Sequence, residues 1–176
     1  LTAHMTRIAP RNGFTWHPHR GLEIYTWMLE GTLYHEDTTG GKGTMSAGEI
    51  QRMFSGDYIE HQELNRTDDP VRVIQIWYVA DTKYKGLEPH YEQVPLEKMA
   101  PRTNGDAVVR EIIGPNGATD SHVNARLTST IVSAGGTATV ELPQEGEDLF
   151  LYVVNGDGRI AAGGQGADVD IYDVLL

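Results

Sequence analysis

Four side chains in two short segments could bind a single metal ion. His17 and His19 are separated by one residue, and His61 and Glu63 repeat that spacing further along the chain. In a β-strand, residues i and i+2 point to the same face and lie about 6–7 Å apart along the backbone. Each pair can therefore lean onto one ion, with nitrogen-to-metal bonds of about 2.0–2.1 Å. We expect His17, His19, His61 and Glu63 to be the metal ligands.

This ligand set would leave a metal able to react with small molecules. Three neutral imidazoles and one carboxylate leave one or two open positions on an octahedral Fe(II) or Ni(II) ion, and these could take dioxygen or water and a substrate oxygen. A hydroxyl bound at such a position becomes more acidic. Glu63 is then the candidate catalytic residue, a general base that accepts the hydroxyl proton. The absence of Cys disfavours structural zinc.

Other residues near the two pairs have competing interpretations. Glu23 shares the alternation of His17 and His19, which makes it the rival carboxylate ligand. Whichever acid stays off the metal could orient a ligand imidazole instead. The remaining histidines in the body of the chain are expected to lie at the surface: His35, His90 and His122.

The segments around these side chains have the composition of strands. Residues 13–16 and 24–29 are β-branched or aromatic almost throughout, and residues 71–79 alternate in a way typical of a half-buried strand. Turn sequences such as Gly40-Gly41 and Ser55-Gly56-Asp57 separate short runs with no helical period. The pattern predicts an all-β sandwich or barrel.

The strand pattern is interrupted once and then resumes. We expect an N-terminal metal-binding barrel over residues 1–92, a linker over 93–107 and a second barrel over 108–176. The second barrel should lack a metal site, because His122 is its single histidine. Similar strand spacing in the two halves suggests a duplicated unit. The chain begins at Leu1 rather than Met, and we expect that natural residues are missing at both ends.

Composition restricts the classes of partner. A net charge of −11 and a pI of about 4.9 argue against direct nucleic-acid binding and against an anionic membrane surface. No apolar run approaches the roughly 18 residues that span a bilayer, and no signal segment is recognisable. With no Cys there is neither a disulfide framework nor a thiol nucleophile. We therefore expect a cytoplasmic protein.

Two sequence motifs combine the predicted ligands with spaced glycines: Gly13-x3-His17-x-His19-x3-Glu23-x7-Gly31 and Gly56-x4-His61-x3-Asn65. They resemble the motifs of the cupin superfamily, small β-barrels that hold a metal in their mouth. More narrowly, the chain is similar to the pirin family through residues 17–23, 47–53 and 56–63. That likeness is dense from Gly13 to Glu92 and thin afterwards. It implies a bicupin, that is, two small jelly-roll-like antiparallel barrels.

The resemblance implies a non-haem metal, usually iron, and favours Glu63 over Glu23 as the acidic ligand. Ni, Mn, Co, Cu and Zn remain alternatives. Bacterial pirins are often quercetin 2,3-dioxygenases, which open a flavonol ring with O2, so a small aromatic substrate and O2 are the expected partners. The resemblance leaves two alternatives open: an iron-dependent redox sensor that binds a protein partner without turnover, as animal pirins act as transcription cofactors, and a cupin that binds or isomerises a small metabolite.

One departure from the family concerns the mouth of the expected site. Tyr58 stands three residues before His61, where the family usually has Gly. A bulkier residue there would narrow the rim and alter substrate preference. Trp16 and Phe14 are the aromatic residues expected to stack on a flat ligand.

Overall fold

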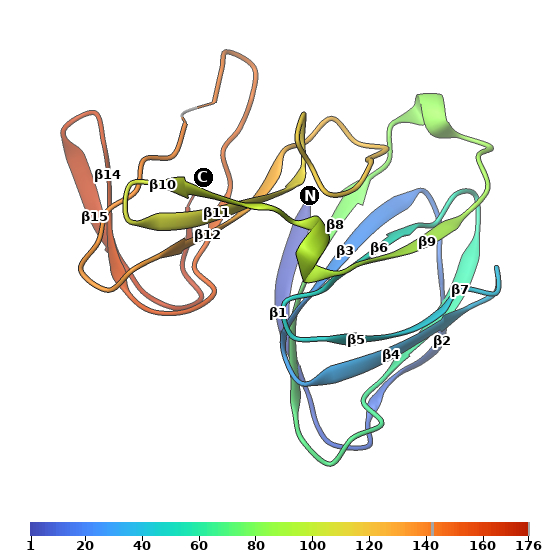
Figure 1. The fold of residues 1–176 in the computed structure, drawn as a ribbon. Helices are drawn as coiled ribbons and strands as arrows, with labels where there is room; N and C mark the ends of the chain where they lie inside the picture. The colour runs from blue at the N-terminus through green and yellow to red at the C-terminus, as the bar shows by residue number, and fades with distance from the viewer. Residues whose placement is uncertain (142, 176) are drawn as a thin grey trace. The chain divides into compact units, whose positions relative to one another are not determined.

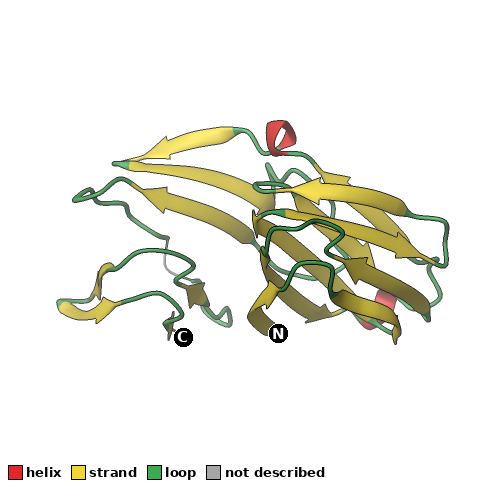
Figure 2. Ribbon diagram, turned by 90° about the horizontal axis from the view of Figure 1, so that it is seen from below, coloured by secondary structure: helices red, strands yellow, loops and turns green. Residues whose placement is uncertain are grey.

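The computed structural model describes residues 1–141 and 143–175, and antiparallel strands dominate it (Figures 1 and 2). Two short 3-10 helices, η1 (Thr82–Tyr84) and η2 (Leu96–Lys98), are the helical segments among the described residues. Neither they nor any other described segment is a helix with the length and apolar character needed to cross a bilayer. The architecture confirms the predicted all-β class.

The chain divides into two compact units, Leu1–Thr137 and Ala138–Leu176. The first unit contains a barrel of two opposed antiparallel sheets (Figure 1). In the five-stranded sheet the order is β1 (Thr2–Ile8), β8 (Val71–Val79), β3 (Leu22–Glu30), β6 (Ile50–Phe54) and β9 (His90–Val94). In the four-stranded sheet the order is β2 (Gly13–His19), β7 (Ile59–Leu64), β4 (Thr32–Asp37) and β5 (Lys42–Ser46).

The core of this barrel lies between the two sheets. One apolar cluster joins Met28 and Val73 of the five-stranded sheet to Leu33 and Met45 of the four-stranded sheet. Strands β4 and β7 alternate between buried and partly exposed residues, as period-2 strands with one face inward should. The inward positions of these two strands include polar as well as apolar side chains, and this polar part of the interior is where the candidate site lies.

A third sheet also belongs to the first unit. Strands β10 (Pro101–Asn104), β11 (Ala107–Ile113) and β12 (Leu127–Val132) pair antiparallel in that order. Ile112 and Ile113 of β11 pack with Tyr25, Ile50 and Val94 of the five-stranded sheet in an apolar cluster. Because Tyr25 neighbours the inward Ile24 along β3, this cluster lies on the opposite face of the sheet from the barrel core.

The second unit is formed by two small strand pairs. Strand β13 (Leu151–Tyr152) pairs with β16 (Val174–Leu175), and β14 (Gly158–Ala162) pairs with β15 (Gln165–Val169). The boundary between the compact units lies beyond the expected linker at 93–107, and that range includes β10. The division into barrels over 1–92 and 108–176 stays a prediction.

Candidate metal centre

Three of the four predicted ligands converge on the inner face of the four-stranded sheet. Strands β2 and β7 pair so that His17 lies directly across from His61, and His19 follows two residues later on the same face. The ligand nitrogens of the three imidazoles all lie within 4.8 Å of one another. Their ring centroids are 4.3–5.0 Å apart. One ion about 2 Å from each nitrogen fits this spacing.

A β-bulge in β2 lies directly before His17 and changes the position of Phe14 relative to the histidines. The register shifts between Phe14 and His17, so that Phe14 pairs with Glu63 while His17 pairs with His61. Bulges insert one extra residue in one strand and re-aim the side chains beyond it. In an unbroken ladder Thr15 would stand across from Glu63. The bulge therefore brings the Phe14 ring beside His17, with which it makes an edge contact at 6.3 Å.

The protonation of the cluster suits a metal. Burial, together with the neighbouring His17, lowers the pKa of His61 to about 2 and the pKa of His19 to about 4. Both imidazoles are thus neutral near pH 7, the form that coordinates metals. His17 donates from Nδ1 to the Thr15 carbonyl at 2.7 Å, which leaves its Nε2 as the free lone pair.

An unpaired buried atom provides the test of fit. The Nε2 atom of His61 is buried and has no hydrogen-bond partner. Leaving such a nitrogen unsatisfied costs roughly 1–3 kcal/mol. A metal bound by the three histidines would satisfy it, so the donor set and its geometry fit a divalent ion of the type that imidazoles bind.

Glu63 belongs to a second cluster that shares His61. The ligand atoms of Glu63, His61 and His35 lie within 4.8 Å of one another, and all three side chains are buried. The structure thus brings Glu63 beside one of the three clustered histidines. A four-ligand set of His17, His19, His61 and Glu63 stays a prediction.

A row of polar side chains from the opposite sheet holds the Glu63 carboxylate. Gln51 donates to Oε1 at 2.8 Å and Gln75 donates to Oε2 at 2.7 Å. Thr26 also donates to Oε1, at 3.4 Å. Thr26 pairs across the sheet with both Gln51 and Gln75, so β6, β3 and β8 present the three donors side by side. These three hydrogen bonds from the five-stranded sheet fix the orientation of the Glu63 carboxylate.

His35 was expected at the surface, and that expectation is wrong. It is fully buried, because it follows Leu33 in the inward alternation of β4 and pairs directly with Glu63. Its ring stacks on Tyr91 at 4.2 Å with planes 6° apart. Burial lowers the pKa of His35 despite the nearby Asp37. The alternation of β4 in the sequence was the signal that could have placed His35 inside.

Glu23, the rival ligand, lies outside both clusters. It is fully buried on the outer face of the five-stranded sheet, where Arg52 donates to Oε1 at 2.5 Å and the backbone N–H of His122 donates to Oε2 at 2.6 Å. The alternation of β2 does not carry over to β3, because a turn with Gly21 at φ +62° takes the chain into the other sheet. Glu23 therefore helps to attach the segment around His122 to the outer face of the five-stranded sheet.

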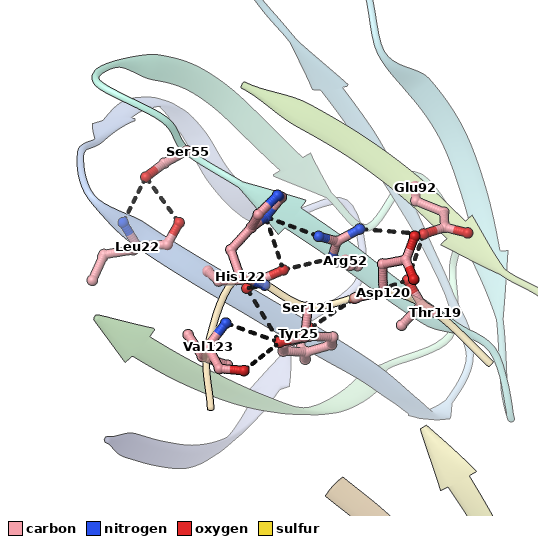
Figure 3. Close-up of polar contacts among 11 residues, drawn as sticks. Leu22, Tyr25, Arg52, Ser55, Glu92, Thr119, Asp120, Ser121, His122 and Val123 are labelled. Atoms are coloured by element: carbon pink, nitrogen blue, oxygen red, sulfur yellow. Dashed lines mark hydrogen bonds and ion pairs between the residues drawn. The ribbon is translucent and has the colours of Figure 1, made fainter. Parts of the chain in front are cut away.

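His122 also departs from its expected surface position. Its ring packs against Phe54 at 4.1 Å and against Tyr84 at 4.6 Å. Its Nδ1 accepts from Arg52 at 3.0 Å (Figure 3). Thr119 of the same segment donates to Glu92 at 2.5 Å. Figure 3 shows that polar contacts attach this segment to strands β3 and β6.

Exposed aromatic residues occur on β2 and just before β7. Phe14, Trp16 and Tyr58 are each between 39% and 47% exposed. The Arg20 guanidinium lies over the Tyr58 ring at 4.3 Å, and the Tyr58 hydroxyl donates to Glu60. Phe14 therefore borders the histidine cluster, while Tyr58 is held by surface partners. A narrower rim at Tyr58 stays a prediction.

An antiparallel barrel with inward histidines on paired strands defines a cupin-type protein. The Pirin family model matches residues 2–78. The chain belongs to the pirin family. This result confirms the predicted family and the cupin-type fold that the family implies.

Individual relatives agree with this assignment. A Mycobacterium tuberculosis protein, whose name assigns it provisionally to the quercetin 2,3-dioxygenases, is 34% identical over 166 residues, which are 93% of this chain and 66% of that protein. A pirin-like protein of Caulobacter vibrioides is 32% identical over 163 residues, with 89% and 66% covered. The chain thus spans about two thirds of the length of these relatives.

Two solved structures are similar in fold. A protein of Geobacillus kaustophilus superimposes with a TM-score of 0.73 at 24% identity, covering 93% of this chain and 70% of that one. A bacterial pirin of Escherichia coli, solved in complex with nickel(II), gives a TM-score of 0.52 at 29% identity, with 62% and 52% covered.

Proposed function

We propose that this protein is a metal-dependent dioxygenase of the quercetin 2,3-dioxygenase type, with iron as its metal and a flavonol-like compound as its substrate. The observation that carries the proposal is the cluster of three imidazoles, one with a buried unpaired Nε2, beside a buried carboxylate. The name of the Mycobacterium relative and the nickel complex of the Escherichia coli pirin support it.

The residues that would hold the metal are His17, His19, His61 and Glu63. When bound, the ion would supply a Lewis acid for a substrate hydroxyl and an open position for dioxygen. A histidine and carboxylate set with open positions is typical of non-haem iron enzymes.

Among the protein's own residues, Glu63 is the one to which we assign the proton transfer. We infer that its carboxylate accepts the proton of the flavonol 3-hydroxyl, because Glu63 is the acidic member of the candidate metal clusters found among the described residues. Gln51 and Gln75 donate to different carboxylate oxygens, so the group is held in place before substrate arrives. Phe14, which borders His17, offers a face on which a flat aromatic ring can stack.

The experiment compares the reaction rates of variants per bound metal ion. Wild-type protein, Glu63→Gln and Glu60→Gln are loaded with Fe(II), quantified by elemental analysis and given quercetin under air, and oxygen uptake and ring-opened product are measured. Glu63→Gln should keep part of its metal yet lose about 10²–10⁴-fold in rate, because a carboxamide cannot accept the proton. Glu60 lies on the other face of β7 and serves as the control.

A fully loaded wild-type protein that leaves quercetin untouched would overturn the proposal. The redox-sensing and metabolite-binding alternatives would then take its place.

A further inference from the structure

We propose that Asp37 and His35 form a hydrogen-bond relay that fixes the tautomer of His61, so that His61 presents the lone pair of Nε2 to the metal. Both are positioning residues, since neither would touch the ion. The inference rests on the metal centre of the proposed function and assigns a role to two buried residues that the ligand set does not use.

The relay begins at a firmly anchored carboxylate. One oxygen of Asp37, Oδ1, accepts from the backbone N–H and the hydroxyl of Thr39 at 2.8 and 2.6 Å, and from the N–H of Gly41 at 3.1 Å. The other oxygen, Oδ2, lies 2.9 Å from Nε2 of His35. Both side chains of this pair are inaccessible to solvent. The carboxylate can therefore neither turn nor exchange its partner for water.

The second step passes between two imidazoles. The His35 ring is held flat against Tyr91, and its Nδ1 lies 3.4 Å from Nδ1 of His61. An ionised carboxylate only accepts, so Nε2 of His35 must donate to Asp37. In neutral His35 the hydrogen on Nε2 leaves Nδ1 as an acceptor, and Nδ1 of His61 must then be the donor.

The tautomer that the relay assigns to His61, with the hydrogen on Nδ1, agrees with an independent observation. A hydrogen on Nδ1 of neutral His61 leaves the lone pair on Nε2, and Nε2 is the buried atom that lacks a partner. His17 reaches the same tautomer directly, by donating to the Thr15 carbonyl. Metal-bound histidines usually have their second nitrogen fixed by a carboxylate or carbonyl. Here a second imidazole stands between the ligand and that carboxylate.

The strand register explains why the relay lies where it does. Asp37 pairs with His61 across β4 and β7, and His35 pairs with Glu63. All four side chains therefore share the inner face of the four-stranded sheet. A one-residue slip of β4 would replace His35 and Asp37 by outward-facing neighbours and break the chain of hydrogen bonds.

The test is the isosteric substitution Asp37→Asn. Three donors surround the Oδ1 position, so the carbonyl oxygen of Asn should occupy it and the amide NH2 should face His35. Nε2 of His35 would then accept, its Nδ1 would carry the hydrogen and donate, and the hydrogen of His61 would move to Nε2. In that tautomer Nε2 has no lone pair for a metal, so metal binding would first require the hydrogen to move back to Nδ1. We expect metal affinity to fall about 10–100-fold, the usual effect of losing such a partner.

Two readouts are measured on wild-type protein, Asp37→Asn and the control Glu36→Gln. Zn(II) affinity comes from competition with a chelator, and histidine tautomers come from long-range 1H–15N spectra of the metal-free and Zn(II)-loaded proteins. Glu36 is the matched control, a carboxylate on the same strand that faces outward and pairs with Lys42. Thermal unfolding verifies that each variant is folded. Only Asp37→Asn should move the His61 hydrogen from Nδ1 to Nε2.

Three results would overturn the relay. They are wild-type His61 already protonated on Nε2, a folded Asp37→Asn with unchanged tautomer and affinity, and a Zn(II)-induced shift showing that His35 itself binds the ion. If wild-type protein binds no metal, the proposed function fails instead, and the spectra of the metal-free protein still decide whether the relay exists.

Discussion

The environment of Glu63 is closely specified, because each carboxylate oxygen receives a hydrogen bond from a different glutamine. Gln75 and Gln51 lie on the opposite sheet, so the acid links the two layers of the barrel. Hydrogen bonds to a charged group are stronger than those between neutral groups. Their removal should therefore be visible in the stability of the metal-free protein.

We expect Gln75→Met to lower the free energy of unfolding of the metal-free protein by roughly 1.5–3 kcal/mol, because a side chain of similar size no longer donates to the buried carboxylate. Urea unfolding measures the loss. Gln62→Met, next to Glu63 on the outward face of β7, is the control. It loses a hydrogen bond to the partly exposed carboxylate of Glu36 and should therefore change stability less. Equal losses in the two variants would show that the Gln75 contact contributes nothing specific.

For individual residues of the candidate site, the sequence predicted some positions and missed others. The i, i+2 spacing predicted that His17, His19 and His61 face inward together, and their ligand nitrogens do lie within 4.8 Å of one another, because each pair lies within one strand. Their role as metal ligands stays a prediction. The same spacing argument misplaced Glu23, since alternation is not transmitted through the turn at Gly21 into another sheet. His35 was misplaced because a polar run beside a turn looks like surface when its buried partner, Asp37, is known only from the fold.

At the scale of elements, the segment 119–123 is attached to the outer face of the five-stranded sheet by charged and polar contacts. Arg52 is central to them, since it donates to Glu23 and to His122 and lies 3.7 Å from Glu92 (Figure 3). Short strand segments were predictable from composition. This attachment was not, because its partners lie between 27 and 99 residues apart in the chain and no local pattern relates them.

Replacing Arg52 by Met should destabilise the protein by roughly 3–5 kcal/mol, because it leaves the buried Glu23 carboxylate without its cationic partner. The double variant Glu23→Gln/Arg52→Met should recover part of the loss, as a double-mutant cycle would report. Arg11→Met, which removes an exposed pair with Asp68, is the control and should have little effect. Additive single and double effects would contradict the assigned coupling.

At the scale of the whole molecule, the chain consists of two compact units, and the histidine cluster lies within the first. A ligand that binds only the folded state stabilises it by mass action. Metal binding at the cluster should therefore affect the unfolding of the first unit.

We expect free metal at about one hundred times its Kd to stabilise the first unit by about 2.7 kcal/mol, and a chelator to remove that gain. Calorimetry with and without Zn(II) measures it. His61→Ala should abolish the shift, whereas His90→Ala, an exposed histidine outside the clusters, should retain it. A shift that survives in His61→Ala would place the metal elsewhere.

Pro18, between the two histidines of β2, has a consequence for how copies of the protein meet. Strand β2 is an edge of its sheet, and edge strands with exposed apolar side chains, here Phe14 and Trp16, invite pairing with other chains. Proline lacks an N–H, so it leaves a gap in the donors that a foreign strand would need. It also restricts His17, the preceding residue, to extended conformations. One residue thus protects the metal-binding edge from aggregation and keeps His17 in strand geometry.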